Sequence, residues 1–325
     1  MRRSLLTISI CGLASIATAP AQAAFPGAPG PIVYAQGMAS ETESSGGLVA
    51  HGPRKNDGSR RLTEDNDDFS PSYSPNGRLI VFASNRDPSE TRGQPHIYVM
   101  ESDGSNVRQL TSGDFSDSNP SFSPNGRLVV FDRAEIGGRG GSQIFSVAVS
   151  GGEPHQISDD AGNDSDPTFT PNGKRIVFVS DRQSSARSDR SNIFSMRPDG
   201  SRIQLLIGGT RLEYEPDVSP DGRRVAFVSN RDHGPNIFIA RIDGRRVRKL
   251  TNSHGSCFRT FCFSSPSWSP DGRHIAFHES GRYSSSVEVM RADGRGFAKD
   301  FAHGGTEEEG YGSYVGAPSW GPRPR

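Results

Sequence analysis

The sequence predicts an all-β fold, a six-bladed propeller built from four-stranded antiparallel blades. Three observations predict it: a pentapeptide that recurs at a near-constant step, short β-branched and aromatic runs between its copies, and partial repeats at both ends. Hydrophobic residues make up only 32% of the 325 positions, and there are 38 glycines and 23 prolines. That composition is typical of short strands joined by many turns, or of disorder. The net charge of +0 and the absence of low-complexity tracts favour the strands.

The recurring pentapeptide is Ser/Thr-Pro-Asn/Asp-Gly-Arg/Lys, with steps of 47 to 50 residues between its copies. Its copies begin at Ser74, Ser123, Thr170, Ser219 and Ser269. A second anchor is an Asp-Gly pair within each interval, replaced by Ser150-Gly151 in the second repeat. Each repeat therefore contains two tight turns, because Pro fixes φ and Gly accepts positive φ.

Four short strands surround these turns in each repeat. Apolar runs follow the pentapeptide at 79–83, 128–131, 176–179, 225–228 and 275–277. Shorter runs precede the second turn at 97–99, 144–147, 193–194 and 237–239. A fourth strand follows the second turn, as at 108–111, and a first strand precedes the pentapeptide. Four strands in about 40–50 residues are the pattern of one propeller blade. No segment has a sustained helical period, so we expect no helix after residue 23.

The two ends of the chain supply complementary parts of a sixth blade. Residues 318–322 repeat the first-strand pattern of 266–270, with no further blade after them. Residues 32–35 match 80–83, and Asp57-Gly58 matches Asp103-Gly104, with no first strand before them. Pairing of the C-terminal strand with the N-terminal strands would close the ring and remove its free edges. Five blades with frayed ends are the alternative.

These repeats resemble a known family. Residues 74–87 and 96–111 are similar to the PD40, or WD40-like, repeat of TolB-type propellers. The resemblance implies a six-bladed propeller and a periplasmic protein that contacts envelope partners. TolB-type proteins also carry a smaller α/β domain, for which residues 24–31 leave no room. Similar blades occur beside the hydrolase domain of prolyl oligopeptidase-like enzymes, but this sequence has no G-x-S-x-G elbow.

The first 23 residues read as a secretory signal. Met1-Arg2-Arg3 precede a mostly apolar run at 5–19 and the small-residue site Ala21-Gln22-Ala23. The run contains too many Ser and Thr residues for a membrane span, and no later segment is long and apolar enough. We therefore expect cleavage after Ala23, a single domain at 24–325, and a periplasmic or extracellular location. In such a compartment Cys257 and Cys262 are expected to form a disulfide rather than a zinc site.

The balanced charge indicates which partners to expect. Lys plus Arg and Asp plus Glu both number 37, so the basic excess typical of a nucleic-acid-binding protein is absent. We expect a monomer with a protein or envelope component as partner, and no cofactor. A divalent cation at the channel has no support in the sequence, because the acidic stretches 65–68 and 163–166 lack the Gly and distant Glu of a calcium loop.

Arginines recur at the end of the second strand, and acids recur at the start of the next blade. The arginines are Arg86, Arg133, Arg182 and Arg231, and the acids include Asp117, Asp164 and Glu213. Because guanidinium groups pair well with carboxylates, we expect structural ion pairs between neighbouring blades. A ligand-binding ring is the alternative. The aromatic residues at repeat-equivalent positions of the first two strands are expected to pack in the core.

Residues that break the repeat are the candidates for specific recognition, since variable loops carry specificity on propellers. The loop before the fifth blade contains Phe258, Arg259, Phe261 and Phe263 beside the two cysteines. The loop before the sixth blade contains Glu307, Glu308, Glu309, Tyr311 and Tyr314. Aromatic residues beside charges are typical of interface centres. Packing of the Phe residues against a blade or in the channel is the alternative.

The sequence therefore favours a non-catalytic binding or scaffold protein that uses the loop face of a propeller. The alternative is a hydrolase or lyase that acts on peptide or glycan in the central funnel. No nucleophile–base spacing and no His-Glu-x-x-His motif is present, and His274 with His278 is the one strand pair of histidines that could serve zinc or catalysis.

Overall fold

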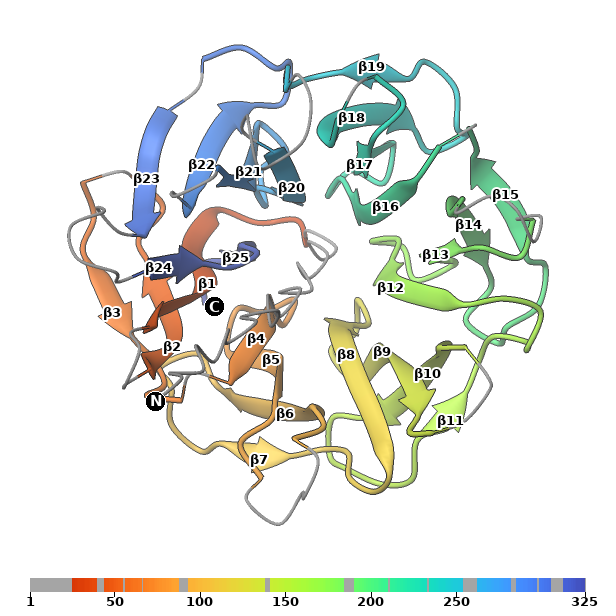
Figure 1. Ribbon diagram of the computed structural model, residues 1–325, viewed down its shortest axis with the longest axis horizontal. Coiled ribbons are helices and arrows are strands. Elements are labelled where there is room, and N and C mark those ends of the chain that lie inside the picture. Colours follow the sequence, from red (N-terminus) through yellow and green to blue (C-terminus); the bar gives the residue numbers. More distant parts are fainter. Residues whose placement is uncertain are drawn as a thin grey trace, which may run out of the picture.

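The computed structural model describes residues 25–324 except 40–43, 55, 66, 88–92, 138–140, 184–189, 210, 233, 254–261, 282–284, 297 and 305–311. Every regular element in this part of the chain is a β-strand. The strands form six antiparallel sheets that stand as blades around a central axis (Figure 1). The six-bladed propeller predicted from the repeat is thus confirmed.

Five blades have four strands each, which run in chain order from the axis to the rim. Blade one comprises β4 (Asp68–Tyr73), β5 (Leu79–Ser84), β6 (His96–Glu101) and β7 (Arg108–Gln109). Blade two comprises β8 (Phe115–Phe122), β9 (Leu128–Glu135), β10 (Gln143–Ala148) and β11 (His155–Gln156). Blade three comprises β12 (Asp164–Phe169), β13 (Ile176–Ser180), β14 (Asn192–Met196) and β15 (Gln204–Ile207). Blade four comprises β16 (Glu213–Val218), β17 (Arg224–Ser229), β18 (Asn236–Arg241) and β19 (Arg248–Lys249). Blade five comprises β20 (Cys262–Trp268), β21 (His274–Ser280), β22 (Ser285–Arg291) and β23 (Ala298–Gly304).

Blade six joins the two ends of the described chain. Its strands are β24 (Gly312–Val315), β25 (Ser319–Pro322), β1 (Pro29–Ala39), β2 (Ser44–His51) and β3 (Ser59–Arg61). Both β24 and β25 pair with β1, one with each half of it. Together they form the edge of the sheet that a single first strand forms in the other blades.

The recurring pentapeptide forms the turn between the first and second strands. In blade one Ser74 Oγ donates to Asn76 Oδ1 at 2.8 Å, and the backbone N–H of Leu79 donates to Ser74 Oγ at 2.9 Å. Gly77 has a φ of +70°, in the left-handed region that glycine adopts without strain. The same hydroxyl-to-Asn/Asp bond recurs in blades two to five. The face that carries these turns and the Asp-Gly turns is called the turn face below, and the opposite one the loop face.

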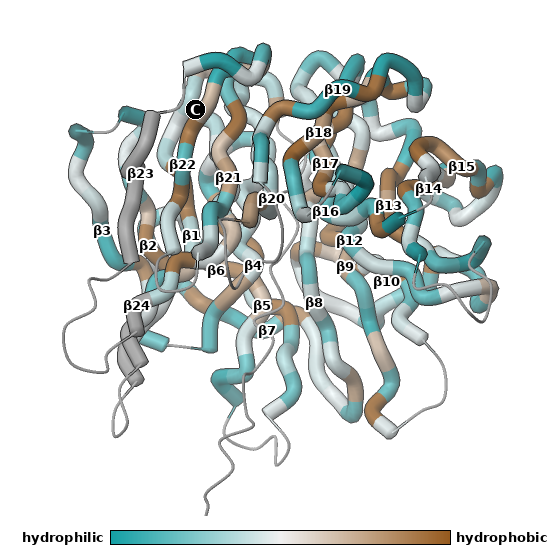
Figure 2. Tube along the Cα trace, turned by 45° about the horizontal axis from the view of Figure 1, so that its top comes forward, coloured by the Kyte–Doolittle hydropathy of each residue, from teal (hydrophilic) through white to brown (hydrophobic). Residues whose placement is uncertain are grey.

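The core lies between adjacent blades. The second-strand aromatic residues are at most 2% exposed; they are Tyr34, Phe82, Phe131, Phe178, Phe227 and Phe277. One cluster joins Ile237 and Ile239 of blade four to Trp268 and Phe277 of blade five. Figure 2 shows the apolar residues concentrated within the strands, with polar residues at both faces. The predicted packing role of these aromatic side chains is confirmed.

Trp320 closes the ring between the C-terminal strand and its neighbours. It stands opposite Ile32 in the pairing of β25 with β1, and its indole N–H donates to Gly30 O at 3.0 Å. Its backbone N–H donates to Ser267 Oγ of blade five, also at 3.0 Å. The side chain is 6% exposed. The alternative of five blades with frayed ends is therefore wrong.

Replacing this closing residue should weaken the whole fold. We expect Trp320→Ala to lower the free energy of unfolding by about 3–5 kcal/mol, because a large buried side chain and its hydrogen bond are lost together. Urea unfolding followed by circular dichroism measures it. Val247→Ala, at an exposed position, is the control and should change stability little. If the two variants were equally stable, Trp320 would not be needed to hold the ring closed.

Candidate functional site

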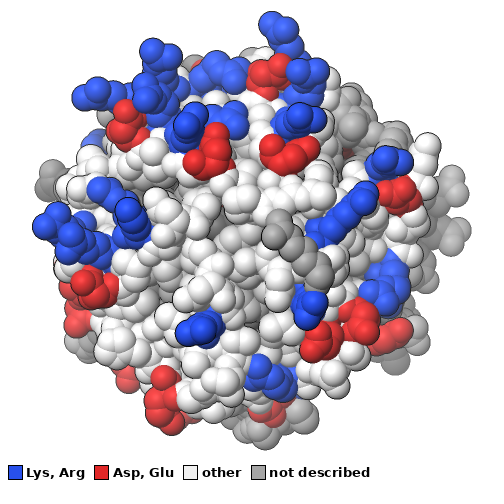
Figure 3. Space-filling view, turned by 180° about the vertical axis from the view of Figure 1, so that it is seen from behind, with Lys and Arg blue, Asp and Glu red and all other residues white. Residues whose placement is uncertain are grey.

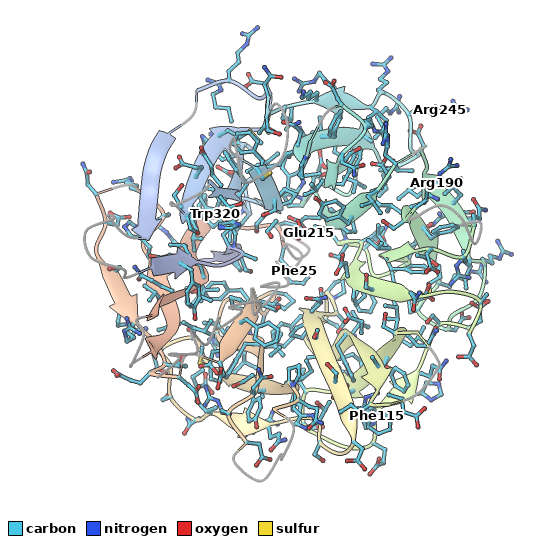
Figure 4. All side chains as sticks on the ribbon, viewed as in Figure 1. Phe25, Phe115, Arg190, Glu215, Arg245 and Trp320 are labelled. Atoms are coloured by element: carbon cyan, nitrogen blue, oxygen red, sulfur yellow. The ribbon has the colours of Figure 1, made fainter. Side chains whose placement is uncertain are left out.

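A ring of strained backbone surrounds the central channel. The first strand of each of blades one to five is interrupted by a residue with φ between +52° and +55°. These residues are Ser70, Asn119, Asp166, Glu215 and Ser265, and at each the register with the second strand shifts. A positive φ is uncommon outside glycine, and such strain persists where the surroundings hold it or where function needs it. Figure 4 places Glu215 at the inner edge of the ring.

Hydrogen bonds link this ring from blade to blade. Asn119 Nδ2 donates both to Asp132 Oδ1 at 2.9 Å and to Asp166 Oδ1 of blade three at 3.0 Å. The backbone N–H of Glu215 donates to Asp166 Oδ2 at 3.3 Å, and that of Ser265 donates to Glu215 Oε2 at 2.7 Å. Each carboxylate thus accepts a backbone N–H from the next blade. The polar ring therefore holds blades two to five in fixed relative positions.

Two carboxyl groups of this ring hold protons more tightly than usual. Burial raises the pKa of Asp166 to about 7, against the lowering effect of the Glu215 N–H. Burial, and next the neighbouring Asp166 carboxylate, raise the pKa of Asp132 well above its usual range, although the hydrogen bonds from Asn119 and from the Asp166 backbone lower it. Both groups are less than 10% exposed, so water stabilises their charged forms poorly. Asp166 can therefore take up a proton in the weakly acidic range.

Phe25 packs beside the same channel. Its side chain is 4% exposed and belongs to a cluster with Val81 of blade one and Phe122 of blade two. Two residues later, the backbone N–H of Gly27 donates to Pro270 O in the turn of blade five at 3.1 Å. Figure 4 places Phe25 near the centre of the ring. The segment that leads into β1 therefore passes from blades one and two to the turn of blade five near the axis of the ring.

The recurring arginines pair with carboxylates near the loop face. Arg86 Nη2 lies 2.5 Å from Asp68 Oδ2, and Arg133 Nε lies 2.6 Å from Asp117 Oδ1. Arg182 Nη2 lies 2.7 Å from Asp164 Oδ2, and Arg231 Nη2 lies 2.7 Å from Glu213 Oε1. All four carboxylates are fully buried. Each guanidinium also stacks within 5.6 Å of the aromatic rings of its own second and third strands.

The prediction paired each of these arginines with an acid of the next blade. That prediction was wrong, because all four arginines pair with an acid of their own blade. The physical reason is strand pairing: an acid at the start of the first strand stands opposite the end of the second strand, as Asp117 stands opposite Arg133. Two of these arginines also contact acids in the connection from the preceding blade. Arg182 Nη1 lies 2.9 Å from the exposed Asp159, and Arg86 Nε lies 3.9 Å from Asp65. Links between blades use the carboxylate-to-backbone bonds of the channel ring. Asp117 also lies 3.6 Å from His96 of blade one.

Blade five replaces the buried acid with a cysteine. Cys262 stands opposite Ser280, the register position that Asp68, Asp164 and Glu213 hold opposite their own serines. It is 3% exposed. Its expected partner Cys257 lies outside the described residues, so the disulfide stays a prediction. A covalent tie here would hold the loop base where the other blades use an ion pair.

The structure describes only two of the residues expected to contact a partner. Phe263 is 8% exposed and meets Phe277 edge-on at 5.8 Å, so it belongs to the core and not to a binding surface. Tyr314 of β24 is half-buried and lies against Gly37 of β1. The others lie outside the described residues: Phe258, Arg259, Phe261, Glu307, Glu308, Glu309 and Tyr311.

The two histidines of β21 do not form a joint site. His278 is buried between Ser264 Oγ at 3.0 Å and Ser285 Oγ at 2.8 Å, and burial lowers its pKa to about 4. His274 lies at the opposite end of β21, beside the Trp320 ring. Within the described ranges, no group of three or more His, Cys, Asp or Glu residues is placed to hold a metal ion. The channel acids Asp132, Asp166 and Glu215 are hydrogen-bonded to protein groups.

A cleft opens on the loop face of blade two and is bordered by the connection that leads to blade three. It has a volume of about 480 Å³ and is lined by Phe115, Phe145 and Arg133, with amides and acids around them. The Arg133 guanidinium lies 4.3 Å from the Phe115 ring and is held by Asp117, so the floor of the cleft is fixed by the ion pair. Figure 4 places Phe115 in blade two, away from the channel.

Sequence reasoning missed Asp132 and the channel ring. Its signal was a charged residue inside an otherwise apolar run: Asp132 follows Phe131 where Ala83, Val179 and Val228 follow the corresponding Phe residues. Asn119 gave no such signal, because only the strained first strand shows that its side chain meets acids of two blades.

The geometry defines a closed six-bladed propeller made of PD40-type repeats, with a polar channel neck and ion pairs near the loop face. The family model described as "TolB beta propeller domain" matches residues 87–187 and 136–295. The chain therefore belongs to the TolB β-propeller family, as its repeats indicated.

Solved structures show the same fold at low sequence identity. TolB from Acinetobacter baumannii is 22% identical, with a TM-score of 0.69 over 90% of this chain and 67% of that one. The putative TolB from Agrobacterium tumefaciens is 19% identical, with a TM-score of 0.63 over 88% of this chain and 98% of that one. Kuenenia stuttgartiensis hydrazine synthase is 16% identical, with a TM-score of 0.69 over 93% of this chain and 48% of that one. Because this fold serves proteins of different kinds, the likeness supports the architecture and leaves activity to the site.

Removing an arginine of a loop-face pair should destabilise the protein. We expect Arg182→Ala to lower the free energy of unfolding by about 3–5 kcal/mol, because the Asp164 carboxylate is left buried without its partner. Urea unfolding measures the loss, and Asp164→Asn in the same background should recover part of it. The control is Arg241→Ala, at an exposed pair, which should cost less than about 1 kcal/mol. Full stability of Arg182→Ala with loss of ligand binding would favour a ligand-binding ring instead.

The raised pKa of Asp166 predicts a pH dependence of stability. Because this pKa of about 7 lies above the ordinary 3.8, the folded state binds more protons than the unfolded state between those values. The free energy of unfolding should therefore fall as the pH rises from about 4 to about 7. In Asp166→Asn this fall should be smaller, as measured by urea unfolding at several pH values. Asp199→Asn, at an exposed turn with a lowered pKa, should keep the wild-type slope; an unchanged slope in Asp166→Asn would contradict the assignment.

Proposed function

We propose that this chain is an exported, non-catalytic binding or scaffold protein that recognises a protein or another cell-envelope component through its loop face. Support for export comes from the signal-like residues 1–23 and from membership of the TolB propeller family. No helix among the described residues has the length and apolar character needed to cross a membrane. The mature protein would begin at Ala24, act as a monomer and carry a Cys257–Cys262 disulfide.

The observation that carries this proposal is the loop-face cleft of blade two. Its walls offer two aromatic rings, and amide groups of Gln143, Gln156 and Asn163 stand around them. Apolar rings with a few directional polar groups are what peptide-binding clefts present. The exposed Glu135 and Asp160 add negative charge at the rim. The cleft therefore suits an extended protein segment that carries an apolar anchor and a nearby positive charge.

A hydrolase or lyase in the central funnel is the second candidate. The observation in its favour is the Asp132–Asp166 pair, which retains protons at a pH where ordinary carboxyls have lost them. A general acid must reach its substrate, however, and both carboxyls are buried and bonded to Asn119. The binding role is therefore the better supported of the two.

Charge reversal at the cleft tests the binding role. We expect the mature protein to capture a specific partner from its own cell envelope, and Glu135→Lys with Asp160→Lys to abolish that capture. The matched control is Arg78→Glu with Arg127→Glu, two reversals on the turn face, which should leave capture intact. Phe261→Ala tests the aromatic loop in the same assay. Thermal melting checks that each variant is folded, and capture that survives the cleft reversals would contradict the proposal.

A further inference from the structure

A second cleft, on the turn face between blades four and five, is lined by arginines. It has a volume of about 700 Å³ and is formed by residues of both blades. Its arginines are Arg224, Arg241, Arg246, Arg248, Arg273 and Arg291, and we call it the arginine cleft. Among the described residues that line it, Asp293 is the only acid. Figure 3 shows the molecule from behind, with Lys and Arg gathered along the upper and left rim of this face.

Several of these guanidinium groups are held in place by uncharged partners. Arg248 Nη1 donates to the backbone carbonyl of Asp293 at 2.9 Å. The Arg224 guanidinium lies 4.4 Å from the Trp268 ring, and its Nη2 donates to Gly272 O at 3.3 Å. These contacts orient the groups and leave their charge in place. The ion pairs that Arg241 and Arg291 make with turn acids are long, 3.8 and 3.5 Å, and exposed, so they neutralise little.

The acids near this cleft are engaged in turn geometry. Asp271 Oδ1 accepts Ser269 Oγ at 2.6 Å and the Arg273 N–H at 3.0 Å. Asp293 Oδ1 accepts the Arg295 N–H at 3.0 Å. Turn formation therefore accounts for these carboxylates, whereas nothing in the turn requires the arginine side chains.

Comparison between repeats shows that the fold does not require these arginines. Blade one makes the same turns but has Leu79, Glu101 and Asn106 at the positions of Arg224, Arg241 and Arg246. Asn106 and Arg246 both have a left-handed φ, +56° and +55°. Asparagine adopts that conformation more readily than arginine, so an arginine there carries a conformational cost. Arg224, Arg241 and Arg246 are thus features of particular blades and not of the propeller, whereas Arg248 and Arg273 stand at positions where blade one also has arginines, Arg108 and Arg78.

The basic surface continues into the next cleft. Between blades five and six a cleft of about 510 Å³ shares His274 and Arg291 with the first and adds Arg54 and Arg323. The apolar floor of the arginine cleft is small, formed by Ile239, Ala240 and Ala292. A ligand for this surface must therefore be compact and carry several negative charges close together.

We propose that the arginine cleft binds a ligand that carries two or more phosphate groups. Arginine forks match phosphate oxygens in bidentate geometry and keep their charge at any physiological pH. A phosphate concentrates up to two negative charges in one small group, so two or three phosphates can meet six guanidinium groups within a single cleft. An acidic peptide spreads one charge over each side chain and matches this density less well. The source is either a soluble phosphate compound or the phosphorylated headgroup of a lipid.

Titration calorimetry with inorganic tripolyphosphate tests the site on the mature protein. We expect binding at low salt that weakens as salt rises, and a loss of at least about tenfold in affinity in Arg246→Asn with Arg273→Gln. Arg246→Asn places the blade-one residue on a backbone that favours it, so the variant should melt no lower than wild type. The matched control, Arg78→Gln with Arg127→Gln, removes two turn-face arginines outside the cleft and should change affinity less than about twofold.

Further ligands distinguish a lipid headgroup from a soluble phosphate compound, and a phosphate ligand from an acidic peptide. Vesicles of phosphatidylcholine with phosphatidylinositol 4,5-bisphosphate, compared with phosphatidylcholine alone, show whether a multiply phosphorylated headgroup reaches the cleft. Competition by tripolyphosphate would place both on one site. Binding of tripolyphosphate without vesicle binding would support a soluble phosphate ligand. Poly-glutamate that binds as tightly at equal charge would overturn the assignment to phosphate. No tripolyphosphate binding, or equal weakening by the control variant, would overturn the site itself.

Discussion

Closure of the ring is the constraint on which the rest of this structure depends. An isolated blade has an apolar face on each side, and it cannot bury either face by itself. Here the pairing of β24 and β25 with β1 joins residues almost 300 positions apart, as the bond from the Trp320 indole N–H to Gly30 O shows. Once that pairing forms, every blade has a neighbour on both sides, and a cluster such as the one around Trp268 can be buried completely.

Two different sets of polar contacts then stabilise the propeller, one within the blades and one between them. Near the loop face, buried carboxylates and stacked arginines tie the first strand of a blade to its second strand. Around the channel, acids accept backbone N–H groups from the next blade and hold strained residues in the left-handed region. The first set stiffens each blade and the second fixes adjacent blades, so the loops of neighbouring blades are presented in constant geometry. A recognition surface benefits from variable loops on a rigid scaffold, because less conformational entropy is lost when a partner binds.

Most of the architecture could be predicted from the sequence because it is repetitive. The turn residues and apolar runs recur at one period, and each recurrence makes the same local bonds, as Ser74 and Asn76 do. The site was harder to predict because its contacts depend on register and on neighbours in space. The sequence indicates that arginines such as Arg133 and acids such as Asp117 form ion pairs, but only the strand pairing shows that these two residues belong to one blade. In the sequence Asp132 is a single charged residue within a strand. Its place in the channel ring depends on hydrogen bonds from Asn119 and from the backbone of Asp166 in the next blade, which the sequence does not show.

The two faces of the propeller can diverge independently because the repeat constrains them differently. On the turn face each tight turn needs the Ser or Thr hydroxyl, the Asn or Asp side chain and the glycine of the pentapeptide. The residue that follows the pentapeptide, such as Leu79 or Arg224, contributes only its backbone to the turn, so its side chain is free to vary. Blades four and five use that freedom to gather arginines, and blade one does not. On the loop face the ion-pair residues are fixed, and variation is left to the connections above them. A charged cleft on one face and an aromatic cleft on the other can therefore coexist on one ring, because neither draws on residues that the other face needs for folding.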